Sequence, residues 1–202
     1  DKPLWRHWLI VVKPDVVESN KALLYVTGGD NTDTAPTAVE EQFVAIAKQT
    51  KSVVAVLTVV PNQPVVFTGD GKSRSEDEIT AFTFDKYMTG GDDEWPLLLP
   101  MAKSAVRAMD TIQTFMASLP EKPVKVDQFV VSGGSKRGWT AWLTAAVDAR
   151  VVGLIPAVID VLNMDEQMRH HYAAYGFYAP SVKDYTDNKI FDRFDTREGQ
   201  KL

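Results

Sequence analysis

The chain contains no cysteine, only three histidines, and no apolar run long enough to cross a bilayer. The absence of cysteine excludes a disulfide scaffold and a thiolate metal site, while it leaves the cellular compartment open. A membrane-spanning helix needs about 18–20 consecutive apolar residues. The longest apolar run, residues 52–60, has only the length of a strand. We therefore expect no membrane span and no cofactor held by cysteine.

Basic residues are too few to indicate a nucleic-acid partner. Lysine and arginine number 22 against 27 aspartates and glutamates, which gives a net charge of -5. Proteins that bind nucleic acid usually carry a basic face. The acidic stretches at 76–78 and 90–94 have no histidine spaced as a co-ligand, so they indicate solvated surface rather than a metal site. We expect no nucleic acid, no metal and no cofactor.

The sequence does contain an alternation of strand-like and helix-like segments, which predicts an α/β fold with a mostly parallel sheet and crossover helices. The first two strands could pair as neighbours, and Ser75, with Glu78 three residues on, could cap a helix as a capping box. The expected strands are residues 7–13, 22–28, 52–60, 126–133 and 150–159, and the expected helices are residues 35–50, 75–88, 100–119 and 138–149.

One turn, Gly133-Gly134-Ser135-Lys136-Arg137-Gly138, joins an expected strand to an expected helix. It fails the P-loop pattern, because the lysine lies between the glycines instead of after the last one. It is compatible with the strained turn that exposes a nucleophilic serine, although arginine stands where the usual G-x-S-x-G pattern has its second glycine. Taken by itself, the turn fits a plain strand-to-helix connection better, and both interpretations stay open.

The loops that follow parallel strands should meet at one edge of the sheet, where ligands of such folds bind. Gly28 and Gly29 follow the second strand, and an oxyanion hole combines N–H groups of such a loop with the N–H of the residue after the nucleophile, here Lys136. Asn62 and Gln63 follow the third strand, where they could bind substrate or merely close a proline-rich loop.

Several segments of the chain resemble the sequences of one protein family. The stretches 133–151, 60–67, 75–88, 102–110 and 155–164 are similar to those of the PhoPQ-activated pathogenicity-related (PqaA-type) proteins. The turn is also similar to the G-C-S-R-x-G turn of glucuronoyl esterases. The resemblance implies an α/β-hydrolase fold in an exported protein whose activity is poorly defined, and it places Ser135 as the nucleophile. From residue 163 the pattern changes to aromatic and charged residues with no buried-strand run, so we expect residues 1–162 to form the N-terminal part of the hydrolase domain and 163–202 a helical, cap-like segment.

The partners of Ser135 are incomplete in this chain. In this fold the acid and the histidine of the triad follow the serine in sequence. Asp160 ends the fifth expected strand and could be the acid, or it could cap the next helix. His7, His170 and His171 are each expected to be structural, so we expect the histidine, and the C-terminal part of the fold, to lie beyond these residues. The chain alone should then be inactive.

The residues thus predict a serine hydrolase that transfers an ester or amide acyl group through Ser135. Its partner would be a small-molecule or peptide acyl substrate, together with the remaining C-terminal part of the same protein. The resemblance implies a secreted or periplasmic location. The alternative is a secreted binding, signalling or virulence-associated protein on a non-catalytic hydrolase scaffold.

Overall fold

The computed structural model describes residues 4–202, which divide into two compact units. The first unit comprises the residues up to Gln63 together with Pro100–Ile159, and the second comprises Pro64–Leu99 and Asp160–Leu202. The division expected from the sequence, at residues 162 and 163, stays a prediction, because compact units need not coincide with evolutionary domains. Within the described residues no helix is long and apolar enough to cross a membrane.

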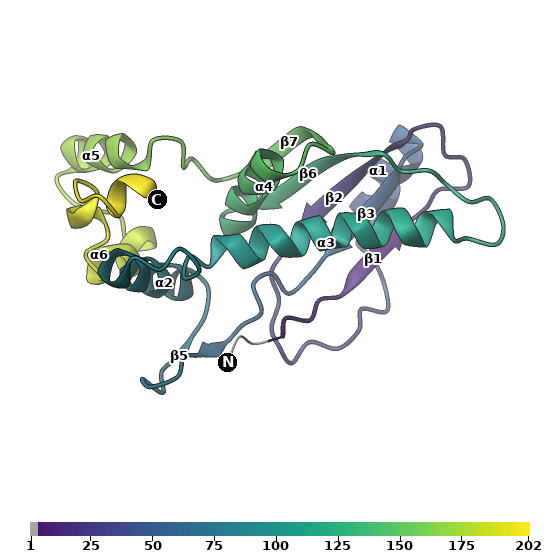
Figure 1. Ribbon diagram of the computed structural model, residues 1–202. Helices are drawn as coiled ribbons and strands as arrows, with labels where there is room; N and C mark the ends of the chain where they lie inside the picture. The colour runs from purple at the N-terminus through teal and green to yellow at the C-terminus, as the bar shows by residue number, and fades with distance from the viewer. Residues whose placement is uncertain (1–3) are drawn as a thin grey trace. The chain divides into compact units, whose positions relative to one another are not determined.

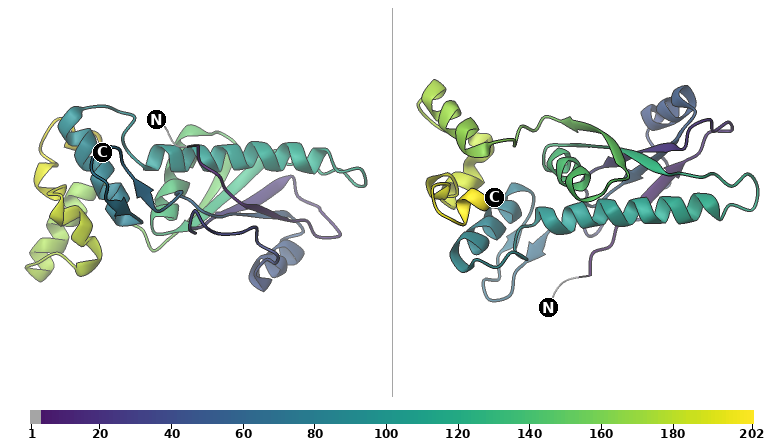
Figure 2. Two further views of the ribbon diagram at one scale, coloured as in Figure 1. Left: turned by 90° about the horizontal axis from the view of Figure 1, so that it is seen from below. Right: turned by 45° about the horizontal axis from the view of Figure 1, so that its top comes forward.

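The first unit is a five-stranded sheet with helices on both faces (Figures 1 and 2). The strand order is β1-β3-β2-β6-β7; β1 runs antiparallel to β3, and the other neighbours are parallel. This confirms the expected α/β class with a mostly parallel sheet. The elements are β1 (Leu9–Val12), β2 (Lys21–Val26), α1 (Glu41–Thr50), β3 (Val53–Leu57), α3 (Leu98–Ala117), β6 (Gln128–Gly134), α4 (Lys136–Val147) and β7 (Val151–Ala157).

The core of the first unit follows the alternation of side chains along the strands. All five residues of β3 are buried, as expected for a central strand that is covered on both faces. Phe43 and Ala47 of α1 pack on one face against Val54 and Val56. The other face is covered by α3, whose apolar stripe is fully buried. That stripe comprises Met101, Ala105, Met109, Ile112 and Met116.

The second unit contains a short hairpin and packed helices. Tyr185 donates a hydrogen bond to Asp77 (2.9 Å), and Arg193 pairs with Asp85 (2.9 Å), so the C-terminal segment is tied to α2. The elements of this unit are β4 (Val65–Val66), β5 (Ser73–Arg74), α2 (Asp77–Gly90), α5 (Met164–Tyr175), α6 (Lys183–Asp187) and the 3₁₀ turns Pro180–Val182, Phe191–Arg193 and Gly199–Lys201.

Three local expectations were wrong. β1 pairs with β3, not with β2, because the chain crosses over between the first two strands instead of turning back in a hairpin. The helix expected from residue 35 begins only at Glu41. Ser75 does not cap α2; Glu76 holds the cap position with φ 54° and makes no side-chain capping bond.

Candidate active site

Ser135 occupies the turn between β6 and α4 in a backbone conformation that L-residues rarely adopt. Its φ is 52° and its ψ is -125°, outside the ordinary helical and extended regions. The Ser135 N–H donates to the carbonyl of Ala157 (2.9 Å), and its own carbonyl accepts from the N–H of Gly138 (2.8 Å). These bonds hold the turn from both sides, and the residue is only partly buried.

Two glycines let α4 begin directly against β6. A Cβ atom on Gly133 would lie 2.6 Å from the carbonyl oxygen of Arg137, and one on Gly138 would lie 2.9 Å from the carbonyl oxygen of Gly133. Real Cβ atoms do not approach backbone that closely, so the two chain segments can touch only because both residues lack a side chain. This explains the second glycine at 138, where the sequence departs from the usual spacing.

The diglycine loop lies beside the serine turn, as expected from the topology. β2 and β6 are parallel neighbours, with Val26 opposite Gly133, so residues 28–29 and Ser135 leave the same edge of the sheet. The N–H groups of residues 30–33 are bonded within the loop or to the carbonyl of Gln63. Among the hydrogen bonds of the described residues, none uses the N–H groups of Gly28 or Gly29.

Asn62 and Gln63 are buried, and both hold backbone in place. The amide of Asn62 accepts from the N–H of Arg6 (2.7 Å) and donates to the carbonyls of Arg6 (2.8 Å) and Val59 (3.0 Å). The Gln63 side chain donates to the carbonyl of Gly29 (3.1 Å). Gln63 therefore supports the diglycine loop, a contact that sequence reasoning missed although topology placed both loops at one edge. Substrate binding by either residue stays a prediction.

Lys136 and Arg137 open α4, and both side chains are buried. The N–H of Lys136 stands at the first helical position, where the helix itself supplies no acceptor. The positive end of the helix dipole favours negative charge at this point. Arg137 Nε–H donates a hydrogen bond to the carbonyl of Val60, which lies in the loop after β3. Oxyanion binding by the Lys136 N–H stays a prediction.

Asp160, His170 and His171 belong to the second unit and line one pocket of about 250 Å³ together with Tyr175. His171 Nε2 accepts the N–H of Ala179 (3.1 Å), so the neutral ring carries its proton on Nδ1. The structure thus brings Asp160 close to both histidines of α5. The role of Asp160 toward Ser135 stays a prediction, because the two residues lie in different units.

His7, in the first unit, is held as a structural side chain. Its Nδ1–H points at the carbonyls of Val59 (3.0 Å) and Thr58 (3.3 Å). Burial lowers the pKa of the imidazole below its ordinary value, and the two carbonyls counteract that shift only in part. The ring lies beside the segment that follows β3, two strand positions along the sheet from β6.

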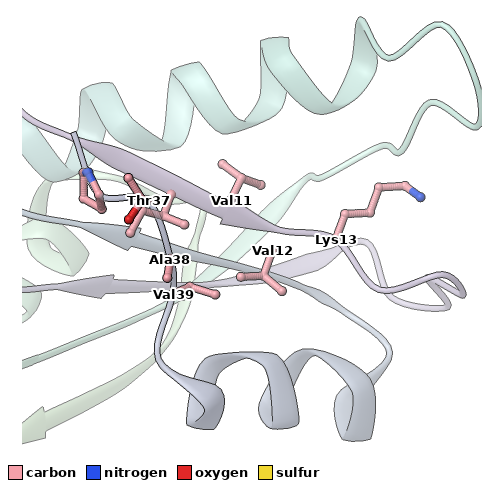
Figure 3. Close-up of a pocket in the computed structure, with 8 residues that line it drawn as sticks. Val11, Val12, Lys13, Thr37, Ala38 and Val39 are labelled. Carbon is pink, nitrogen blue, oxygen red and sulfur yellow. The ribbon is translucent and has the colours of Figure 1, made fainter.

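A larger pocket lies at the other edge of the sheet (Figure 3). Residues 36–39 run alongside β1 and enclose about 440 Å³ with residues 10–13. Most of its lining residues are of apolar types, with Lys13 as the charged member and Thr37 as the hydroxyl. The segment shields an edge strand. Within residues 4–202 no group of three histidine, aspartate or glutamate side chains could hold a metal ion.

Comparisons with known proteins place the chain in a family. The chain is 34% identical over 194 residues to autocrine proliferation repressor protein A of Dictyostelium discoideum, covering 95% of the chain and 39% of the relative. Acetyl xylan esterase 1 of Thermoanaerobacterium sp. JW/SL YS485 has a TM-score of 0.45 at 14% identity, over 89% of this chain and 56% of that one. The family model described as PhoPQ-activated pathogenicity-related protein matches residues 1–202. With its mostly parallel α/β sheet, the chain belongs to the PhoPQ-activated pathogenicity-related protein family.

Proposed function

We propose that the protein is a serine hydrolase in which Ser135 attacks an ester or amide carbonyl. The observation that carries the proposal is the conformation of Ser135, with φ 52° and ψ -125° at a strand-to-helix turn. A nucleophilic serine in an α/β-hydrolase sits on such a strained turn, which exposes its hydroxyl at the edge of the sheet. Glu76 adopts nearly the same conformation at the start of α2, so what supports the proposal is this conformation together with the position of Ser135, at the end of β6 and next to the diglycine loop after β2.

The proposed chemistry is acyl transfer. Ser135 Oγ forms a bond to the carbonyl carbon while its proton passes to a general base, and the leaving group departs when the tetrahedral intermediate collapses. The N–H groups of Lys136, Gly28 and Gly29 would stabilise the negative oxygen of that intermediate. One such donor is typically worth about 3–4 kcal/mol in the transition state. Asn62 and Gln63 would border the acyl substrate.

The general base and the acid are the open part of the proposal. Asp160 is the proposed acid, and we place the histidine in polypeptide beyond residues 1–202. The supporting observation is length, because the chain spans 39% of the Dictyostelium relative. His7 is already committed to two carbonyls. We expect the 202 residues alone to show no turnover, and strong esterase activity of the isolated chain would contradict this assignment of the base.

A fluorophosphonate probe, which phosphonylates activated serines, tests the proposal. We expect it to label the full-length protein and to spare a Ser135→Ala variant. Ser118→Ala, which removes an exposed hydroxyl that bonds only to the carbonyl of Phe115, is the matched control and should label like the wild type. Labelling that persists in Ser135→Ala, with the modified residue mapped elsewhere by mass spectrometry, would refute Ser135 as the nucleophile.

The second candidate function is extracellular binding or signalling on a hydrolase scaffold. The Dictyostelium relative is named as an autocrine proliferation repressor, which favours a secreted signal over an enzyme for that protein. Arg137 in place of the usual glycine is compatible with it. A well-folded full-length protein that the probe does not label would support this candidate. For both candidates we propose a secreted or periplasmic location, which fractionation of the producing cells would test.

A further inference from the structure

The side chain of Arg137 is a buried cation in the turn that carries Ser135. It is 8% exposed and stands two residues after the serine, where the usual nucleophile turn has a glycine. Burying a guanidinium is unfavourable unless its N–H groups are hydrogen-bonded. Its partners therefore indicate what the arginine contributes to the turn.

The guanidinium joins three segments of the first unit. Arg137 Nε–H donates to the carbonyl of Val60 in the loop after β3. A Cβ atom on Gly28 would lie 2.7 Å from Arg137 Nη2 and 3.1 Å from Cζ, so the guanidinium lies directly against the diglycine loop after β2. Those two loops are tied to each other, because Val59 N–H donates to Gly28 (2.8 Å) and Val60 N–H to Thr27 (3.1 Å).

We propose that Arg137 is a positioning residue that fixes the diglycine loop relative to Ser135. The inference rests on the proposed function, since it explains how the Gly28 and Gly29 donors are kept at a set distance from the nucleophile. The guanidinium is anchored to the carbonyl of Val60 and occupies the space that a side chain at 28 would fill. The positive charge of the guanidinium also adds to the field that favours an oxyanion beside it.

The geometry explains two sequence features together. A side chain at residue 28 would displace the guanidinium, because its Cβ atom would lie 2.7 Å from Arg137 Nη2. The turn has its second glycine at position 138 instead of 137, because position 137 is occupied by the arginine. A displacement of about 1 Å at a reacting group can lower a rate by about 100-fold, so loosening this loop should affect the chemistry more than the fold.

The test compares Arg137→Met, Arg137→Lys and Gly28→Ala in the full-length protein. Arg74→Met is the matched control, because Arg74 is equally buried but belongs to the second unit and pairs with Asp70. We expect the labelling rate per folded molecule to fall by about 100-fold in Arg137→Met and Gly28→Ala, to be partly restored by lysine, and to be unchanged in Arg74→Met. An Arg137→Met protein that is folded and labels at the wild-type rate would overturn the inference.

A second readout does not depend on activity. Hydrogen exchange and NMR shifts of the Gly28 and Gly29 amides should change in Arg137→Met, while the amide of Gly153 in β7 stays as in the wild type. Unchanged diglycine amides would overturn the positioning role even if labelling were slower. If the wild type itself is not labelled, the proposed function fails, and the amide measurement then decides the inference.

Discussion

Gly133→Ala and Gly134→Ala form a sharp test of the turn, because adjacent glycines have opposite surroundings. A Cβ atom on Gly133 would lie 2.6 Å from the carbonyl oxygen and 2.7 Å from the carbonyl carbon of Arg137, whereas one on Gly134 would meet nothing within 4 Å. The first approach is about 0.8 Å inside the 3.4 Å at which ordinary contact begins. Backbone, unlike the end of a flexible side chain, cannot move aside cheaply.

We therefore expect Gly133→Ala to lower the free energy of unfolding by about 2–3 kcal/mol, the upper part of the range for overpacking. Gly134→Ala should change it by less than about 0.5 kcal/mol. With an m-value of about 3 kcal/mol per M, the urea midpoint of Gly133→Ala should fall by roughly 0.7–1 M. Equal midpoints for the two variants, followed by circular dichroism, would refute the close approach of α4 to β6.

Three further predictions concern other parts of the first unit. The free energy of unfolding should fall as the pH drops below about 6.5. The reason is that His7 binds a proton there in the unfolded chain, whereas burial lowers its pKa in the folded protein, which takes up the proton only at lower pH. Urea titrations at several pH values should show that the free energy of unfolding of His7→Asn depends less steeply on pH than that of the wild type. Arg150→Met should lower the free energy of unfolding by about 1–2 kcal/mol, because it removes the ion pair with partly buried Asp148 (2.7 Å); an unchanged urea midpoint would contradict the importance of this pair. In a sample of residues 1–202 alone, Ile155→Lys should give a lower average mass in light scattering than the wild type, because β7 is an edge strand of this sheet with Ile155 55% exposed; equal masses would exclude this strand as a surface of self-association.

The order of elements could be predicted from the sequence, whereas several of their ends could not. The consecutive apolar residues of 52–60 predict a strand that is buried on both faces, and all five residues of β3 are indeed buried. Helix α1 begins later than its apolar spacing indicates, because residues 36–39 lie against β1 instead of continuing the helix. Only tertiary contact decides that boundary, so a local pattern cannot reveal it.

The pairing of β1 likewise depends on a long-range choice. A turn-like segment between two β-rich runs permits a hairpin, but β1 lies antiparallel to β3, and β2 occupies the interior of the sheet. The parallel partners of β2 on both sides come from crossover connections. Sequence signals for hairpins report on neighbours along the chain, and they carry no information about which edge a strand finally occupies.

The candidate site was predictable in outline because topology alone brings the loops after parallel strands to one edge. The adjacency of Gly28 and Ser135 follows from β2 and β6 being neighbours. The contacts of Arg137 and Gln63 could not be predicted, because long polar side chains can reach several partners. Arg137, for example, donates to the carbonyl of Val60, which lies far from it in the sequence.

The positive φ of Ser135 has a consequence for anyone who would redesign this protein. An L-residue at φ 52° holds strain of about 1–3 kcal/mol that a glycine would largely release. Selection for stability by itself would thus favour replacing the serine with glycine, and a library sorted only for thermal resistance should enrich that change. Serine at this position thus makes the folded state less stable than glycine would.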